Sequence, residues 1–249
     1  MIGTQKETLM KVNDRYCTLY YEDDDDYGAV EIDRANTALL VIDMQPVFVN
    51  RPHIENPTEA QRRHAERWEQ FYRAIDQTVI PNNELILEAF RKRGMSVNFA
   101  RITSLKRDGS DRSLVQRSSG YNDLLIPEGD PSGEIVPQLA PQDDEIVFRK
   151  TTDSAVAGTN LAMAFRNMGI DTVVCTGVLT DQCVSGTVRS LADESFKVWL
   201  IEDATRAATQ EIQDAELAIL NNIYCHVINT CELLEALGEQ GDTEGATSR

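Results

Sequence analysis

The clearest indication of the fold is a short apolar run that ends at a glycine. A helical pattern follows it directly. Residues 172–175 are Thr, Val, Val and Cys, and a run this short and rich in β-branched residues is typical of a buried strand. Gly177 ends the strand, and apolar residues recur at helical spacing from Cys183 onward. The chain is therefore expected to turn from a buried strand into a helix here.

The same alternation of strands and helices runs from Thr37 to Leu237. The expected strands cover residues 37–42, 96–100, 145–148, 172–175, 197–201 and 223–228. Residues 57–80 are expected to form a helix that Pro81 terminates, with Asn82 or Asn83 capping a second helix that runs through Arg93. Apolar strands that alternate with amphipathic helices are typical of a parallel sheet covered on both faces. We therefore predict an α/β fold, a three-layer doubly wound sheet that is mostly parallel, with about six strands and helices on both faces.

The chain shows no internal repeat and no linker that would divide this alternating region. We predict an N-terminal extension at residues 1–35, one domain at 36–238, and a polar, flexible tail at 239–249. The extension holds two candidate strands, at 16–21 and 28–32. Because the domain does not need it, we expect the extension to contact a neighbouring copy of the chain.

Charge and cysteine content exclude several classes of function. The formal net charge of −17 disfavours partners such as nucleic acid and anionic membranes. No apolar run approaches the roughly 18 residues of a membrane-spanning helix, and the N-terminus lacks the apolar core of a signal peptide. The five cysteines lack Cys-x-x-Cys spacing, so free thiols in a cytoplasmic setting are expected. The three histidines lack ligand-like spacing, so no metal site is expected.

Three polar residues, Asp43, Lys150 and Cys183, stand beyond the carboxyl ends of three expected strands. The carboxyl ends of parallel strands share one edge of the sheet, so the three can converge. Each also has an ordinary structural role: Asp43 as a helix cap, Lys150 as a surface lysine, and Cys183 as a small buried hydrophobe.

Taken together, these residues supply what nucleophilic acyl chemistry needs. The ammonium of Lys150 would lower the pKa of the Cys183 thiol from about 8.5 toward neutrality. Asp43 would accept the thiol proton and pass it to a leaving nitrogen. Backbone N–H groups between Val178 and Cys183 would hold the developing oxyanion.

The sequence resembles the isochorismatase-like cysteine hydrolases from about Asn36 to Leu237. The matching segments, in order, are Ala38-Leu-Leu-Val-Ile-Asp-Met-Gln45 with Phe48, Lys150 with Ser154-Ala155 and Thr159-x-Leu161, Gly177-Val-Leu-Thr-Asp-Gln-Cys-Val184, Thr187-x-Arg189, Ala192-Asp193 and Glu202-Asp203-Ala204. The resemblance implies the doubly wound sheet and a catalytic triad of Asp43, Lys150 and Cys183. It also implies a cis peptide between Val178 and Leu179, with the N–H groups of Leu179 and Cys183 as oxyanion donors.

Within this family, Pro81-Asn-Asn83, Arg101 and residues 107–113 are most similar to members that act on small amides and ureides. The chain departs from the family in two places. Val156 stands where an aromatic residue is common, and no Asp-x-His metal motif follows Asp43, so His53 is left alone in a loop. The missing motif argues against a metal-assisted nicotinamidase, so we expect an enzyme without a metal or cofactor. The resemblance implies assembly as a homodimer or homotetramer.

We predict a hydrolase that cleaves a C–N bond in a small carboxamide, carbamoyl or ureido substrate through a thioester on Cys183. Phe48, Gln45 and Leu179 are assigned to the substrate pocket. Arg101 is expected to bind a substrate carboxylate or to serve as a structural ion-pair partner. Two alternatives stay open: an isochorismate-type vinyl ether hydrolase, which does not need the cysteine, and a non-catalytic binding protein on the same fold.

Overall fold

The computed structural model describes residues 14–22, 32–118, 120 and 123–238, and its centre is a parallel sheet of six strands. The strands are β1 (Thr37–Ile42), β2 (Ser96–Ile102), β3 (Ile146–Lys150), β4 (Thr172–Val178), β5 (Lys197–Arg206) and β6 (His226–Ile228). They lie in the order β3-β2-β1-β4-β5-β6, and every recorded pairing is parallel. The predicted doubly wound α/β fold is confirmed.

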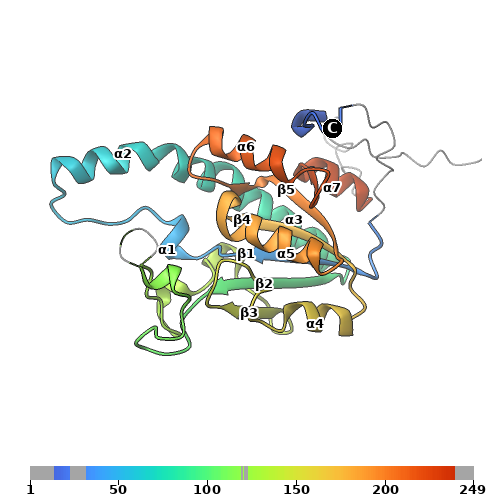
Figure 1. The fold of residues 1–249 in the computed structure, drawn as a ribbon, viewed down its shortest axis with the longest axis horizontal. Helices are drawn as coiled ribbons and strands as arrows, with labels where there is room; N and C mark the ends of the chain where they lie inside the picture. The colour runs from blue at the N-terminus through green and yellow to red at the C-terminus, as the bar shows by residue number, and fades with distance from the viewer. Residues whose placement is uncertain (1–13, 23–31, 119, 121–122, 239–249) are drawn as a thin grey trace, which may run out of the picture.

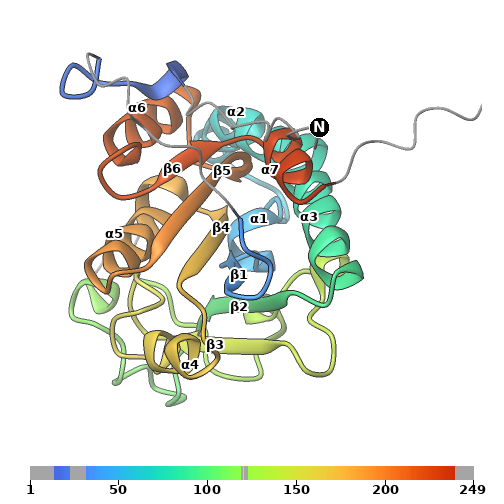
Figure 2. The same ribbon diagram turned by 90° about the vertical axis from the view of Figure 1, so that its right-hand side faces the viewer.

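Helices cover both faces of the sheet (Figures 1 and 2). They are α1 (Pro46–Val49), α2 (Glu59–Ala74), α3 (Ile80–Lys92), α4 (Leu161–Asn167), α5 (Ser185–Asp193), α6 (Gln210–Leu220) and α7 (Thr230–Ala236). Figure 2 shows α4, α5 and α6 on one side of the sheet and α3 and α7 on the other.

Successive residues of the strands point to opposite faces, and this alternation makes two separate cores. On β1, Leu39 and Val41 pack in the core that includes Phe90 of α3. Ala38, Leu40 and Ile42 pack in the core that includes Leu191 of α5. All six residues of β1 are buried, because the strand is central and covered on both faces. The near-continuous apolar sequence of β1 therefore correctly predicted a central strand that is covered on both faces.

The second and third helices depart from the sequence prediction. Residues 57–80 were expected to form a helix that Pro81 terminates, but a π-helical segment, Ile75–Val79, joins α2 directly to α3. Pro81 is the second residue of α3, and the wider π-helical turn before it allows the helix to continue past a residue that has no N–H. The predicted capping by Asn82 or Asn83 is also wrong. Their side-chain amides donate to the β5 carbonyls of Asp203 and Ala204, at 2.8 and 3.0 Å.

The helix pair α2 and α3 therefore forms one long rod whose α2 end projects beyond the sheet (Figure 1). The loop before α2 is fastened to it through Arg51, whose guanidinium lies 3.1 Å from Glu69 and 2.5 Å from Asp76. The guanidinium also stacks over the ring of Tyr72, with 5.4 Å between its carbon and the ring centroid. This projecting rod and its loop form one wall of the pocket described below.

Part of the N-terminal extension packs against its own domain. Residues Asp14–Tyr16 form a 3₁₀ turn rather than the start of the expected strand. The hydroxyl of Tyr16 donates to Glu202 at 2.7 Å, and the amide of Asn221 donates to the Tyr16 carbonyl. The other candidate strand, at 28–32, falls mostly outside the described residues, as does the tail from residue 239. In the described part of the chain, no helix combines the length and apolar character needed to cross a bilayer.

Candidate active site

The site lies where the sheet reverses its winding. β1 and β4 are neighbours, and the chain runs outward from them in opposite directions, toward β3 on one side and β6 on the other. In doubly wound sheets such a switch point leaves a crevice beyond the carboxyl ends of the central strands, where ligands bind. Asp43 follows β1 directly, and Cys183 follows β4 by five residues.

Asp43 is turned into the crevice by an unusual backbone conformation. Its φ is +50°, in the left-handed region that Asp tolerates better than most residues. The backbone N–H of Asp43 donates to the carbonyl of Ala100 at 2.9 Å, and the N–H of Gln45 donates back to the Asp43 carbonyl at 2.7 Å. The end of β1 therefore makes a sharp bend that is hydrogen-bonded to β2, and the carboxyl group is fully buried.

Cys183 lies in a π-helical turn, Thr180–Val184, that leads into α5. The peptide bond between Val178 and Leu179 is cis, as the family resemblance implied. The hydroxyl of Thr187, one turn along α5, donates to the Cys183 carbonyl at 2.7 Å and accepts a hydrogen bond from the N–H of Ala155. The turn is thus tied both to its own helix and to the loop after β3, which fixes the position of the sulfur atom.

Lys150 connects the other two residues. It is the last residue of β3, and its side chain is completely buried. Its Nζ lies 2.7 Å from Asp43 Oδ2, 3.3 Å from Cys183 Sγ and 3.1 Å from the carbonyl oxygen of Thr152. The structure therefore brings together all three candidate catalytic residues, from three different strands.

Burial has the largest single effect on the pKa of each of these three side chains. It raises the pKa of the Asp43 carboxyl above its ordinary value, although the Lys150 ammonium opposes this. Burial disfavours the ammonium as well, but the adjacent Asp43 carboxylate and Cys183 sulfur hold the pKa of Lys150 above its ordinary value. The 2.7 Å contact between Lys150 Nζ and Asp43 Oδ2 forms a buried ion pair.

The Cys183 thiol behaves differently from the sequence-based expectation. Burial raises the pKa of the thiol well above its ordinary value, and the Asp43 carboxylate raises it further. The Lys150 ammonium lowers the pKa, as expected, but does not outweigh these two effects. The expectation of a near-neutral thiol pKa is therefore wrong for the resting site, because Asp43 and Lys150 largely neutralise each other. The sulfur rests as a thiol.

A second carboxylate near the sulfur was missed by sequence reasoning. Oδ1 of Asp153 lies 3.8 Å from Cys183 Sγ, within hydrogen-bonding range for sulfur. Asp153 belongs to the irregular loop after β3, whose residue Ser154 is bonded to Ser190 of α5 at 2.9 Å. The only signal in the sequence was the position of Asp153, three residues after Lys150 and beside the family-like Ser154-Ala155 pair.

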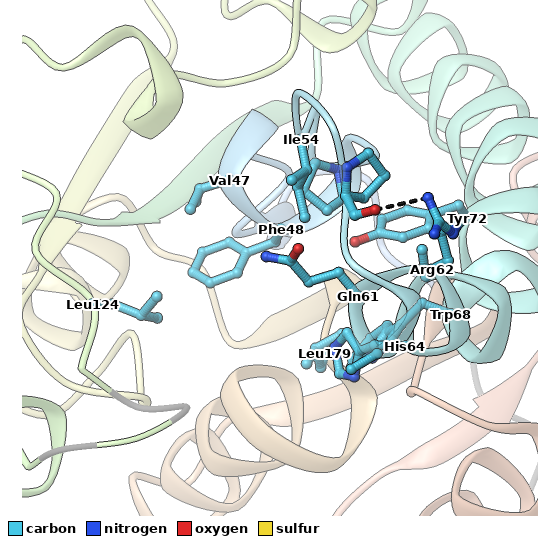
Figure 3. Close-up of a pocket in the computed structure, with 14 residues that line it drawn as sticks. Val47, Phe48, Ile54, Gln61, Arg62, His64, Trp68, Tyr72, Leu124 and Leu179 are labelled. Carbon is cyan, nitrogen blue, oxygen red and sulfur yellow. Dashed lines mark hydrogen bonds between the residues drawn. The ribbon is translucent and has the colours of Figure 1, made fainter.

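A largely apolar pocket of about 470 Å³ reaches Leu179, at the cis peptide just before the turn that carries Cys183. Figure 3 shows Phe48, Leu124 and Leu179 around this space, facing side chains of α2. Its wall is made of Val47, Phe48, Pro52, Ile54, Pro57, Ala60, Gln61, Arg62, His64, Ala65, Trp68, Tyr72, Leu124 and Leu179. Leu179 is the N-cap of the turn that carries Cys183, so the pocket borders the candidate catalytic residues there. Two predicted substrate contacts, Phe48 and Leu179, therefore line the pocket.

Gln45 and Arg101, the other two predicted substrate contacts, are engaged with the backbone instead. The buried amide of Gln45 donates to the carbonyls of Ile102 and Gly133 at 3.0 and 2.7 Å and accepts from the Ile102 N–H at 2.9 Å. Arg101 donates to the Gly133 carbonyl at 3.0 Å and pairs with Glu134 at 3.2 Å. Both side chains hold the long loop of residues 103–142 against the end of β2, and neither lines the pocket.

The described residues contain no group of three or more His, Cys, Asp and Glu side chains arranged to hold a metal ion. His53 and His64 lie near the pocket, and His64 lines it.

Comparison with known proteins identifies the family. The model of the isochorismatase domain matches residues 37–232. A protein of Arabidopsis thaliana named "Probable inactive nicotinamidase At3g16190" is 32% identical over 192 residues, which cover 76% of this chain and 89% of that protein. The N-carbamoylsarcosine amidase of an Arthrobacter species is 28% identical, covering 67% of this chain and 65% of that enzyme. The ureidoacrylate amidohydrolase RutB of Pantoea ananatis is 25% identical, covering 84% and 85%.

Among solved structures, a cysteine hydrolase from Pseudomonas syringae pv. phaseolicola 1448A has the same fold. It superimposes with a TM-score of 0.70 at 24% identity and covers 84% of this chain and 95% of that chain. The two chains therefore share the parallel α/β fold. The chain belongs to the isochorismatase family of hydrolases.

Proposed function

We propose that this protein is a cysteine-dependent amidohydrolase that cleaves a C–N bond in a small carboxamide, carbamoyl or ureido compound. One observation carries the proposal: Lys150 Nζ lies within 3.3 Å of Cys183 Sγ and 2.7 Å of Asp43. A buried acid, a buried cation and a thiol in contact form a group that can move one proton and stabilise one negative charge.

In the first half-reaction, Cys183 Sγ attacks the carbonyl carbon while Asp43 takes the thiol proton. The raised pKa of Asp43 suits it to this exchange near neutral pH. Lys150 stabilises the sulfur while it carries negative charge, and the N–H groups of Leu179 and Cys183 hold the oxyanion. The C–N bond then breaks, and the departing nitrogen takes the proton from Asp43, so that ammonia or an amine leaves.

In the second half-reaction, water attacks the thioester carbon and gives a proton to Asp43. The C–S bond breaks, the acid product leaves, and the proton returns to Cys183 Sγ. The site then has the same protonation as before the reaction. No group outside this chain, apart from substrate and water, is consumed.

The relatives support this reaction class above the two alternatives. An N-carbamoylsarcosine amidase and a ureidoacrylate amidohydrolase are among them, and both names describe hydrolysis of a C–N bond. A vinyl ether hydrolase would leave the contact between Lys150 and the Cys183 sulfur unused. One relative is named as a probable inactive nicotinamidase, which is consistent with the non-catalytic alternative. The test must therefore measure turnover directly.

The test is ammonia release from a panel of nicotinamide, biuret, N-carbamoyl amino acids, ureidoacrylate, maleamate and simple aliphatic amides. Wild type and Cys183→Ala are assayed side by side. Loss of the nucleophile should lower kcat by at least roughly 10³-fold while the far-UV circular dichroism is unchanged. Equal turnover by the two proteins would overturn the covalent mechanism, and an acyl-enzyme trapped by acid quench on the Cys183 peptide would support it.

We also propose that the protein is a homodimer or homotetramer located in the cytoplasm. All five cysteines are free thiols, which suits a reducing compartment. Light scattering of the full chain and of a truncation starting at Asn36 tests the assembly. If both have the same number of subunits, the extension is not an arm between subunits.

A further inference from the structure

Asp153 is an exposed residue whose carboxylate contacts the proposed nucleophile, whereas Asp43 and Lys150 are buried. Oδ1 lies 3.8 Å from Cys183 Sγ, so a substrate attacked by the sulfur lies in the field of this carboxylate. The catalytic cycle proposed above gives Asp153 no part in proton transfer.

The carboxylate is held in place by the long loop. The side-chain amide of Gln116, which is 4% exposed, donates to Asp153 Oδ1 at 3.3 Å. The N–H of Ser113 donates to the carbonyl of Thr151 at 3.2 Å, so the two segments are joined in two places. An exposed aspartate would otherwise sample several rotamers, and these bonds favour the one that faces the sulfur.

The charge of Asp153 is not balanced nearby. The two groups that contact its side chain, the Gln116 amide and the Cys183 thiol, are both neutral. Within the described residues, no lysine, arginine or histidine forms an ion pair with it. On the far wall of the pocket, the guanidinium of Arg62 lies 3.7 Å from Glu59 and is bonded to the Pro57 carbonyl (Figure 3). Since Lys150 and Asp43 pair with each other, Asp153 is the unpaired charge among the described residues that contact the sulfur.

We propose that Asp153 sets the charge preference of this site. It disfavours substrates with a carboxylate next to the attacked carbonyl and favours neutral or cationic amides and ureides, whose N–H groups can donate to Oδ1. This inference rests on the proposed function for its substrate class, but the charge preference itself can be measured at the sulfur without any substrate.

The experiment compares two alkylating reagents that differ mainly in charge, iodoacetate and iodoacetamide. Modification of Cys183 is followed by peptide mass spectrometry at one pH. The ratio of the two rates cancels any change in the thiolate fraction, since both reagents attack the same thiolate. Cys17 and Cys231 are exposed and serve as references within the same molecule.

In wild type, the ratio of the iodoacetate rate to the iodoacetamide rate should be lower at Cys183 than at Cys231. Asp153→Asn should raise the ratio at Cys183 about fivefold, the effect expected for two unit charges about 4 Å apart in a largely aqueous setting. The ratios at Cys17 and Cys231 should not change. Gln116→Leu, which frees the carboxylate, should raise the Cys183 ratio by a smaller factor.

Asp144→Asn is the matched control, since it removes the same charge from an exposed residue just before β3, at the opposite end of that strand. It should leave every ratio unchanged. An unchanged Cys183 ratio in Asp153→Asn would overturn the proposal, and so would an equal change in Asp144→Asn.

A paired substrate assay separates this inference from the proposed function. Maleamate and its methyl ester differ by one negative charge, and Asp153→Asn should lower KM for the anion more than for the ester. If neither compound is hydrolysed, the alkylation ratios still decide the charge preference. If both are hydrolysed with unchanged KM values, the amidohydrolase proposal stands and the role of Asp153 is wrong.

Discussion

Gly177 lies so close to Ile42 that a Cβ atom added to the glycine would stand 2.0 Å from the Ile42 carbonyl oxygen. The φ of Gly177 is +107°, a conformation that side chains rarely adopt. Ile42 is the last residue of β1 and directly precedes Asp43, and Gly177 is the penultimate residue of β4. This close approach therefore sets the distance between the two loops that carry Asp43 and Cys183.

Substituting Gly177→Ala should lower the free energy of unfolding by about 3 kcal/mol or more, because the backbone of β1 must move to admit the methyl group. Gly94→Ala is the control. Gly94 also has a positive φ, +63°, but no atom lies within 4 Å of its added Cβ. The Gly94→Ala substitution should lower the free energy of unfolding by only about 1–2 kcal/mol. Urea unfolding of both variants measures the difference, and equal losses would mean that the contact with Ile42 is unimportant.

The sequence predicted what depends on local signals. Near-continuous apolar strands marked the centre of the sheet, and the polar residues after them, Asp43, Lys150 and Cys183, could be placed at one edge by topology alone. The contact of Asp153 with the sulfur could not be predicted, because it depends on the path of an irregular loop. The role of Gln45 could not be predicted either. It follows Asp43 closely in sequence, but its side chain is hydrogen-bonded to Gly133, in a segment without apolar periodicity.

The continuous rod of α2 and α3 was missed for a different reason. A proline inside a helical pattern normally ends the helix, and Pro81 was interpreted in this way. The π-helical segment before it shifts the hydrogen-bond register, and this allows the chain to pass the proline without a break. Such an insertion leaves little trace in the spacing of apolar residues.

Alkylation of Cys183 by iodoacetamide should accelerate steadily with pH. The pKa of this thiol is raised well above its ordinary value, chiefly by burial, so the thiolate fraction grows about tenfold per pH unit across pH 7 to 9. The rate should show no plateau in this range. Peptide mass spectrometry across the pH series provides the measurement. A plateau below pH 7 would show that a thiolate is already present in the resting site.

Asp43→Asn should speed alkylation of the Cys183 thiol but slow turnover of substrate. Removing the carboxylate removes a group that raises the pKa of the Cys183 thiol, so alkylation at pH 8 should become at least about threefold faster. Turnover should nevertheless fall by at least about 10²-fold, because no base remains to carry the proton to the leaving nitrogen. Lys150→Met is the opposite control, since it removes the group that lowers the thiol pKa and should slow alkylation. Parallel loss of both rates in Asp43→Asn would contradict this assignment.

Gln45→Leu should lower stability rather than substrate affinity. The substitution leaves the Ile102 N–H and the carbonyls of Ile102 and Gly133 without their buried partner, at a cost of about 1–3 kcal/mol. Gln142→Leu, at an exposed glutamine, should change stability by less than about 0.5 kcal/mol. Thermal unfolding and KM are measured for both. A raised KM with unchanged stability would instead place Gln45 in contact with substrate, as the sequence first indicated.

The buried ion pair beside Cys183 also bears on how long the enzyme survives in an oxidising episode. Peroxides attack thiolates far faster than thiols, so a cysteine kept protonated between turnovers is a poor target for sulfenic acid formation. Exposed Cys17 and Cys231 would be modified first, away from the crevice. We therefore expect Cys183, with its raised thiol pKa, to resist peroxide while no substrate is bound.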